Sequence, residues 1–184
     1  ALYAHGDRNL AITEANHRME QRPTDLVPRA ILALQGSESL KSFAEELRGF
    51  AGEVEFELLE TALVFADMML FQEAAELVQA VCLDNIPESE CQPLPLYYLG
   101  YLYGKMGGEE VLAGNYLTRA SKTYRDFVFP SRPEEISVLL YALERNPDDA
   151  NAHQHLGNLL AGLGRVEEAV PHWEIAGKID PALS

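Results

Sequence analysis

Apolar and small residues recur along most of the chain at intervals of three and four, which is the spacing of one face of an α-helix. No segment shows the sustained alternation that is typical of a strand. Most prolines fall between the periodic segments, where proline starts or ends helices. The pattern therefore predicts an all-α fold of about ten helices, over residues 7–21, 25–35, 37–50, 53–69, 71–84, 93–106, 109–126, 133–145, 150–163 and 166–179.

Capping residues support two of the predicted helix starts. Asp148 and Asp149 stand just before the helix expected at residue 150, where a carboxylate can accept from free backbone N–H groups. Ser131 with Glu134 is a capping-box candidate for the preceding helix. Pro171 lies inside the last predicted helix, so we expect a mild kink or a late start there.

A repeat is visible near the end of the chain, as a spacing of large and small residues over two predicted helices. Its members are His153, Leu156, Gly157, Leu160, Ala169, Trp173, Ala176 and Pro181. This order resembles the tetratricopeptide repeat (TPR), which carries aromatic, Leu-Gly, Tyr, Ala, Phe and Pro positions over 34 residues. The small residues Gly157 and Ala169 are expected where the two helices cross, because larger side chains would push the helix axes apart.

Two further copies precede this one. The nearer copy consists of Leu96, Leu99, Gly100, Tyr103, Ala113, Leu117 and Ala120, and the earlier copy of Leu58, Thr61, Ala62, Phe65, Ala74, Val78, Val81 and Pro87. The resemblance implies a TPR-like α-solenoid of stacked antiparallel helical hairpins, since one hairpin cannot bury its apolar face alone.

The repeats suggest one helical repeat domain that covers residues 1–184. Within it we expect degenerate repeats over 1–52, repeats over about 55–87 and 93–125, an extra loop and helix over 126–147, and a repeat over 150–183.

The stretch from Phe127 to Pro181 also resembles the TPR region of large bacterial proteins that carry an N-terminal conserved domain of unknown function. The resemblance rests on Phe129-Pro130, Arg132, Asn146-Pro147, Leu156 to Leu160, and Trp173-Glu174. It implies a helical-repeat module of a larger protein, and the first residue, Ala1 rather than Met, fits a piece of a longer chain.

The charge balance limits the classes of partner that the chain is expected to bind. The chain has 14 Lys and Arg against 29 Asp and Glu, which gives a net charge of −15. Such a balance argues against nucleic acid and anionic membrane surfaces, which both require basic residues. No membrane span or signal peptide is visible, so we expect a cytoplasmic protein.

Candidate chemistry is sparse, and we predict no enzyme, no cofactor and no metal site. His153 and His155 are two residues apart and point in different directions on a helix, with His172 on the partner helix, so packing and surface roles are favoured over metal binding. Paired acids such as Glu167-Glu168 fall near helix starts, where the helix dipole favours negative charge. The glycines at 104, 107 and 108 are interpreted as a hairpin turn rather than a phosphate-binding loop.

The informative surface is the concave one that the resemblance implies, lined by the first helix of each repeat. Its candidate binding residues are Tyr97, Tyr101, Lys105, Gln154 and Asn158. Further positions on the same helix faces are Phe56, Leu59, Leu63, Asp67, Leu94, Asn151 and Gly162. Tyrosine and amide side chains suit an extended peptide. The alternative is that Tyr97 and Tyr101 simply contact the next helix.

We therefore predict a non-catalytic interaction scaffold that binds a peptide or protein segment. A structural or dimerisation accessory to a carbohydrate-acting or carbohydrate-binding domain of the same polypeptide is the alternative, and a homo-oligomer stays open. A clamp for carboxylate tails is disfavoured, because Lys105 has no second convergent cation. The Phe127 to Arg132 segment, which carries Phe127 and Phe129, is expected to pack back on the helices and partly fill the groove.

Overall fold

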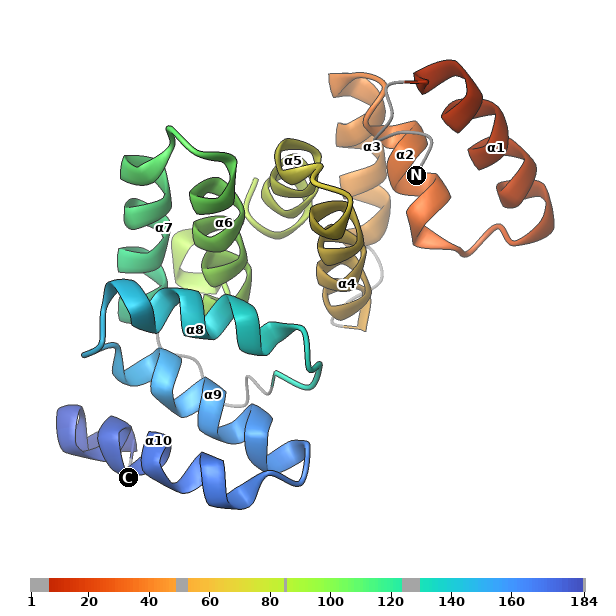
Figure 1. The fold of residues 1–184 in the computed structure, drawn as a ribbon. Helices are drawn as coiled ribbons and strands as arrows, with labels where there is room; N and C mark the ends of the chain where they lie inside the picture. Colours follow the sequence, from red (N-terminus) through yellow and green to blue (C-terminus); the bar gives the residue numbers. More distant parts are fainter. Residues whose placement is uncertain (1–6, 49–52, 85, 124–129, 184) are drawn as a thin grey trace. The chain divides into compact units, whose positions relative to one another are not determined.

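The computed structural model describes residues 7–48, 53–84, 86–123 and 130–183. Over these residues the secondary structure consists of α-helices and two short 3-10 turns, in agreement with the predicted all-α class (Figure 1). The helices are α1 (Arg8–Gln21), α2 (Leu26–Ala33), α3 (Ser37–Arg48), α4 (Glu53–Asp67), α5 (Phe71–Cys82), α6 (Pro93–Met106), α7 (Glu110–Lys122), α8 (Glu135–Arg145), α9 (Ala150–Gly162) and α10 (Val166–Ile179). The 3-10 turns are η1 (Glu88–Glu90) and η2 (Pro181–Leu183).

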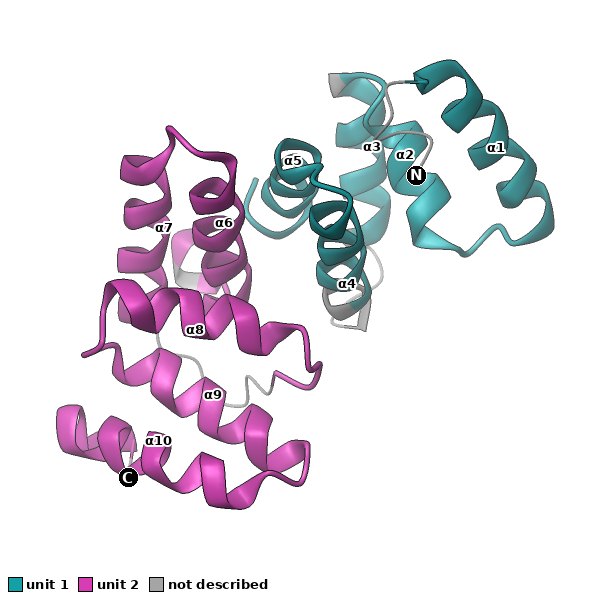
Figure 2. Ribbon diagram, in the orientation of Figure 1, with its two compact units in different colours: residues 1–87 teal, residues 88–184 magenta. Residues whose placement is uncertain are grey.

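The chain forms two compact units, residues 1–87 and residues 88–184, which we call unit 1 and unit 2 (Figure 2). In unit 1, α1 packs on α2, α2 on α3 and α4, and α5 on α3 and α4. In unit 2, α6 pairs with α7, and α9 pairs with α10. Helix α8 packs on both α6 and α9, while α7 also contacts α9.

The repeat positions form the cores of these hairpins. In the α4–α5 hairpin, Leu58, Ala62, Phe65, Ala74 and Val78 have no exposed surface. Their burial confirms that the helical period identifies the inward face. Small residues dominate the crossings, which lets the two helix backbones approach closely.

The corresponding glycines of unit 2 lie in tight contacts. A Cβ added at Gly157 would overlap the indole of Trp173 on α10, at 2.5 Å from its nearest atom. A Cβ at Gly100 would meet the end of the Leu117 side chain on α7. Both glycines therefore allow the second helix of a hairpin to lie against the first, as the repeat pattern predicts.

Helix starts follow the predicted capping only in part. Asp149 caps α9, because its carboxylate accepts from the backbone N–H of Ala152 at 3.0 Å. The capping box of Ser131 and Glu134 is wrong: Glu134 is the N-cap residue of α8 and its side chain makes no capping bond. The carboxylate of Glu135, the first residue of α8, instead accepts from the backbone N–H of Ser131 at 2.8 Å and of Arg132 at 3.0 Å in the preceding segment. Helix α10 does not start late, since it begins at Val166 and runs through Pro171.

Candidate interaction surface

Two adjacent tyrosines of α6 are buried and bond to the starts of two later helices. The hydroxyl of Tyr97 donates to the carboxylate of Asp149 at the N-terminus of α9, at 2.9 Å. The hydroxyl of Tyr98 donates to Glu135 at the start of α8, at 3.2 Å. Burial raises the pKa of both carboxyl groups and of both phenols. These two bonds fasten α8 and α9 onto α6.

The expectation that Tyr97 is exposed on a groove is therefore wrong. Its side chain has no exposed surface, and its ring meets His155 of α9 edge-on. The physical reason is that the connection before α9 brings Asp149 to α6, and a buried hydroxyl needs such a partner. Of the two interpretations of Tyr97, helix contact is the one that the structure supports.

Tyr101 and Lys105 lie one and two turns further along the same face of α6, where α8 contributes Tyr141 and Arg145. The rings of Tyr101 and Tyr141 meet edge-on, with centroids 5.5 Å apart. The Lys105 ammonium lies 5.3 Å from the Tyr101 ring centroid and 5.6 Å from that of Tyr141. The Arg145 guanidinium lies 3.4 Å from the Tyr141 centroid. We call these four residues the aromatic–basic patch.

A glycine inside α6 makes this arrangement possible. A Cβ at Gly104 would overlap the hydroxyl of Tyr141, so only glycine lets that ring lie against the helix. Glycine within a helix costs about 1 kcal/mol relative to alanine, and its presence indicates a close approach. Gly104 is therefore the sequence signal for the contact with Tyr141, and its interpretation as a turn glycine is wrong because α6 continues to Met106.

The patch differs in accessibility from residue to residue. Lys105 and Arg145 are exposed, Tyr101 is half-buried and Tyr141 is buried. Two acids lie near the patch. Glu144 lies 3.7 Å from the Arg145 guanidinium and partly offsets its charge. The charge of Glu110 acts on the Tyr141 phenol and contributes to its raised pKa. Burial raises the pKa of the Tyr141 phenol, so its hydroxyl keeps its proton at neutral pH.

The other candidate residues lie on α9. Asn158 is half-buried, and its side-chain oxygen accepts from the indole N–H of Trp173 at 3.0 Å. Gln154, one turn earlier, is half-buried, and its Oε1 atom is buried without a hydrogen-bond partner among the described residues. Tyr101 and Lys105 are thus brought together with α8, whereas Asn158 is placed beside Trp173 of α10.

The remaining positions expected on the groove differ in how much of each side chain is exposed. Leu59, Leu94 and Asn151 are buried, and Asn151 donates to the backbone oxygen of Ser121 at 2.9 Å. Leu63 is half-buried, and Asp67 and Gly162 are exposed. The side chain of Phe56 and the residues Phe127 and Phe129 lie outside the described residues, so the expectation for that segment stays a prediction.

The histidines of the last hairpin form a pair between α9 and α10. The Nδ1 atoms of His153 and His172 are 2.8 Å apart, and Nε2 of His153 lies 3.1 Å from the backbone oxygen of Pro147. Nε2–H of His153 can donate to that oxygen while its Nδ1 accepts from His172. Burial, aided by His153, lowers the pKa of His172. Within the described residues no group of three or more His, Cys, Asp or Glu is arranged to hold a metal ion.

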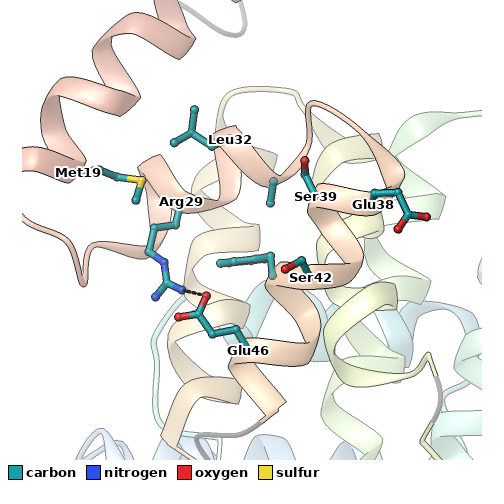
Figure 3. Close-up of a pocket in the computed structure, with 9 residues that line it drawn as sticks. Met19, Arg29, Leu32, Glu38, Ser39, Ser42 and Glu46 are labelled. Carbon is teal, nitrogen blue, oxygen red and sulfur yellow. Dashed lines mark ion pairs between the residues drawn. The ribbon is translucent and has the colours of Figure 1, made fainter.

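A separate hollow lies in unit 1 among α1, α2 and α3, with a volume of about 500 Å³ (Figure 3). Its apolar wall includes Leu32 and Phe43, and Met19 reaches it from α1. Arg29 crosses it to Glu46, with 2.7 Å between guanidinium nitrogen and carboxylate oxygen, and stacks 5.4 Å from the Phe43 centroid. The sequence pattern predicts no site here, because the repeat is degenerate, and Glu46 stands out only as a member of the acid pair Glu45-Glu46.

The family comparison falls on unit 2. The family model described as tetratricopeptide repeat matches residues 138–170, from within α8 through α9 into α10. The match supports membership of the TPR superfamily. A TPR implies protein–protein interaction in general, and such repeats are typically non-catalytic. No curated protein and no solved structure matches the chain. Among the described residues, none of the helices has the length and apolar character needed to cross a membrane.

Proposed function

We propose that the chain is a non-catalytic interaction module that binds a segment of a partner protein across the aromatic–basic patch. The observation that supports this is that Tyr101, Lys105, Tyr141 and Arg145 come together from two helices, with both cations exposed and Tyr101 half-buried. Aromatic faces and arginine are the side chains most often responsible for binding energy at interfaces.

The chemistry of the patch favours a segment that carries a carboxylate beside an apolar side chain. Lys105 and Arg145 each lie against the Tyr141 ring, so the proposed ligand carries an anionic group that binds one or both of these cations. Lys105 is the candidate cation on the first helices of the repeats, the only helices on which the sequence pattern places the groove, and Arg145 of α8 adds a second cation at the Tyr141 ring. Glu144 and the net charge of −15 oppose a strongly acidic ligand, so one carboxylate suits the patch better than a run of acids.

A displayed library of random peptides tests the proposal directly. Peptides enriched on the whole chain should share a carboxylate next to an apolar residue. Tyr101→Ala should weaken their binding by about 1–3 kcal/mol, as expected for an aromatic anchor, and leave the helical circular dichroism unchanged. Tyr116→Ala is the matched control: Tyr116 is a half-buried tyrosine of α7 that stacks on Tyr103, outside the patch.

The control decides between a local and a general effect. Equal loss of binding in Tyr101→Ala and Tyr116→Ala would contradict the proposed site. Enriched peptides without any carboxylate preference, or binding that Arg145→Gln leaves intact, would contradict the proposed ligand chemistry. An origin in large bacterial proteins, and an accessory role beside a carbohydrate-acting domain, stay predictions that flanking sequence would test.

A further inference from the structure

The two hairpins of unit 2 can be aligned residue by residue along the repeat. In this alignment Tyr101 of α6 corresponds to Asn158 of α9, and Gly104 corresponds to Ala161. In the α6–α7 hairpin this face is covered by α8, whose Tyr141 lies against Gly104. A packed helix, α8, therefore covers this face of the α6–α7 hairpin.

The same face of the α9–α10 hairpin has no covering helix among the described residues. Its α10 side is an apolar stripe at helical spacing: Val166 is 52% exposed, Val170 is 42% exposed, and Trp173 is half-buried. Exposed valines of this kind lose the stabilisation that burial of their surface would provide. An apolar stripe at this spacing on an accessible helix face is typical of an interaction site.

The α9 side of this face carries the two amides. Asn158 is fixed by Trp173, and the buried Oε1 of Gln154 still lacks a hydrogen-bond partner among the described residues. We call Gln154, Asn158, Val166, Val170 and Trp173 the outer face.

We propose that a second copy of this chain packs on the outer face, with α10 of one copy antiparallel to α10 of the other. The charges along α10 support this occupant. Glu167 and Glu168 lie in its first turn, where Arg165 of the same copy holds Glu168 at 2.7 Å and leaves Glu167 as the acid for the partner, and Lys178 lies in its last turn. An antiparallel twofold pair places each Lys178 near the acidic turn of the other copy and opposes the two helix dipoles.

The apolar stripe must overcome repulsion between the copies. Each chain carries a net charge of −15, which disfavours association at low ionic strength. Salt screens this long-range repulsion and leaves the apolar contact intact. Because the apolar stripe supplies the binding energy and the contacts of Lys178 with the acidic turn set only the orientation, the dimer should strengthen with added salt. This inference does not rest on the aromatic–basic patch, which lies on α6 and α8.

Analytical ultracentrifugation of the whole chain, over concentrations on the order of 10 µM to 1 mM, tests the pairing in the range of weak interfaces. We expect a shift from monomer to dimer with concentration, stronger in high salt. Val170→Lys should raise the dissociation constant at least about tenfold, because it buries a charge in the apolar stripe. Val111→Lys is the matched control, an 81%-exposed valine on α7 outside the outer face, and should change it less than about twofold.

Charge exchange tests the orientation. Glu167→Lys should weaken the dimer, and the added change Lys178→Glu should restore it if the helices run antiparallel. Circular dichroism checks that each variant folds. A chain that stays monomeric at all concentrations would overturn the proposal and leave the outer face to another protein's helix. Equal effects of Val170→Lys and Val111→Lys would also overturn it, and failure of the exchange would overturn the antiparallel pairing.

Discussion

The α6–α7 and α9–α10 hairpins follow one residue pattern but differ in the side chains that point away from their own crossing. At corresponding positions α6 has Tyr97 and Tyr98, while α9 has Gln154 and His155. The tyrosine hydroxyls bond to buried carboxylates at the starts of later helices, so the first hairpin is fastened into unit 2. The repeat pattern thus specifies the hairpin, and the residues outside the pattern specify its neighbours.

The largest loss of stability is expected from a substitution at the crossing of α9 and α10. Gly157→Leu should destabilise unit 2 by about 3 kcal/mol, because the added side chain must displace the rigid Trp173 indole. Thermal or urea unfolding measures the change. Gly162→Leu, at an exposed glycine of the same helix with no atom within 4 Å of the added Cβ, should change stability little. Equal effects of the two substitutions would contradict the helix crossing.

The buried tyrosine bonds come next in expected size. Tyr97→Phe should cost about 2 kcal/mol, because it removes a hydrogen bond from the buried carboxylate of Asp149. Tyr98→Phe should cost less, since its bond to Glu135 is longer. Urea unfolding of both variants gives the order. A larger loss of stability in Tyr98→Phe than in Tyr97→Phe would contradict this ranking of the two hydrogen bonds.

These contacts show which features of the fold can be predicted from local spacing in the sequence. The period of three and four placed the helices and the buried repeat residues correctly, because both depend on positions close in the chain. The sequence pattern places Tyr97 on the groove because it does not reveal that Asp149, 52 residues away, is the partner of the Tyr97 hydroxyl. Local spacing does not reveal a long-range hydrogen bond.

The aromatic–basic patch shows the same limit. Tyr101 and Lys105 were named from their place on α6, but Tyr141 and Arg145 were not, because α8 had no partner in the repeat pattern. Only packing brings α8 onto α6, and the sequence trace of that packing is Gly104. A glycine within a helix, three residues after another candidate, was the available signal.

The histidine pair gives the second hairpin a pH dependence that the first lacks. The lowered pKa of His172 means that the unfolded chain binds a proton more readily than the folded chain. Stability should therefore fall as pH decreases through the ordinary histidine range, near pH 6.5. His172→Gln should flatten this decrease, measured by urea unfolding at several pH values.

The carboxylates act in the opposite direction and serve as the check on this assignment. The raised pKa values of Asp149 and Glu135 mean that the folded chain takes up protons first, so they favour folding as pH falls towards the carboxyl range. The exposed carboxyl groups of Glu110 and Glu168 have lowered pKa values and act in the same direction as His172, so a variant without His172 should lose less stability on mild acidification than the parent chain. An unchanged acid loss in His172→Gln would show that another group causes it.

The smallest expected effect concerns the turn that closes each hairpin. Gly107 and Gly108 follow α6, and Gly164 follows α9, all with positive φ. The α4–α5 turn of unit 1 instead uses Met69 at φ 62°, a conformation that costs a residue with a Cβ about 1 kcal/mol or more. Met69 is 75% exposed, so its side chain contributes little packing that a substitution would remove.

Met69→Gly should therefore stabilise unit 1 by up to about 1 kcal/mol, reduced by the greater freedom of glycine in the unfolded chain. Gly164→Ala is the converse change in unit 2 and should destabilise it by a similar amount, since its φ is 77°. Urea unfolding, followed for both variants beside the parent chain, measures the pair. Stabilisation by Gly164→Ala, or a loss of stability in Met69→Gly, would mean that contacts rather than backbone conformation determine these turns.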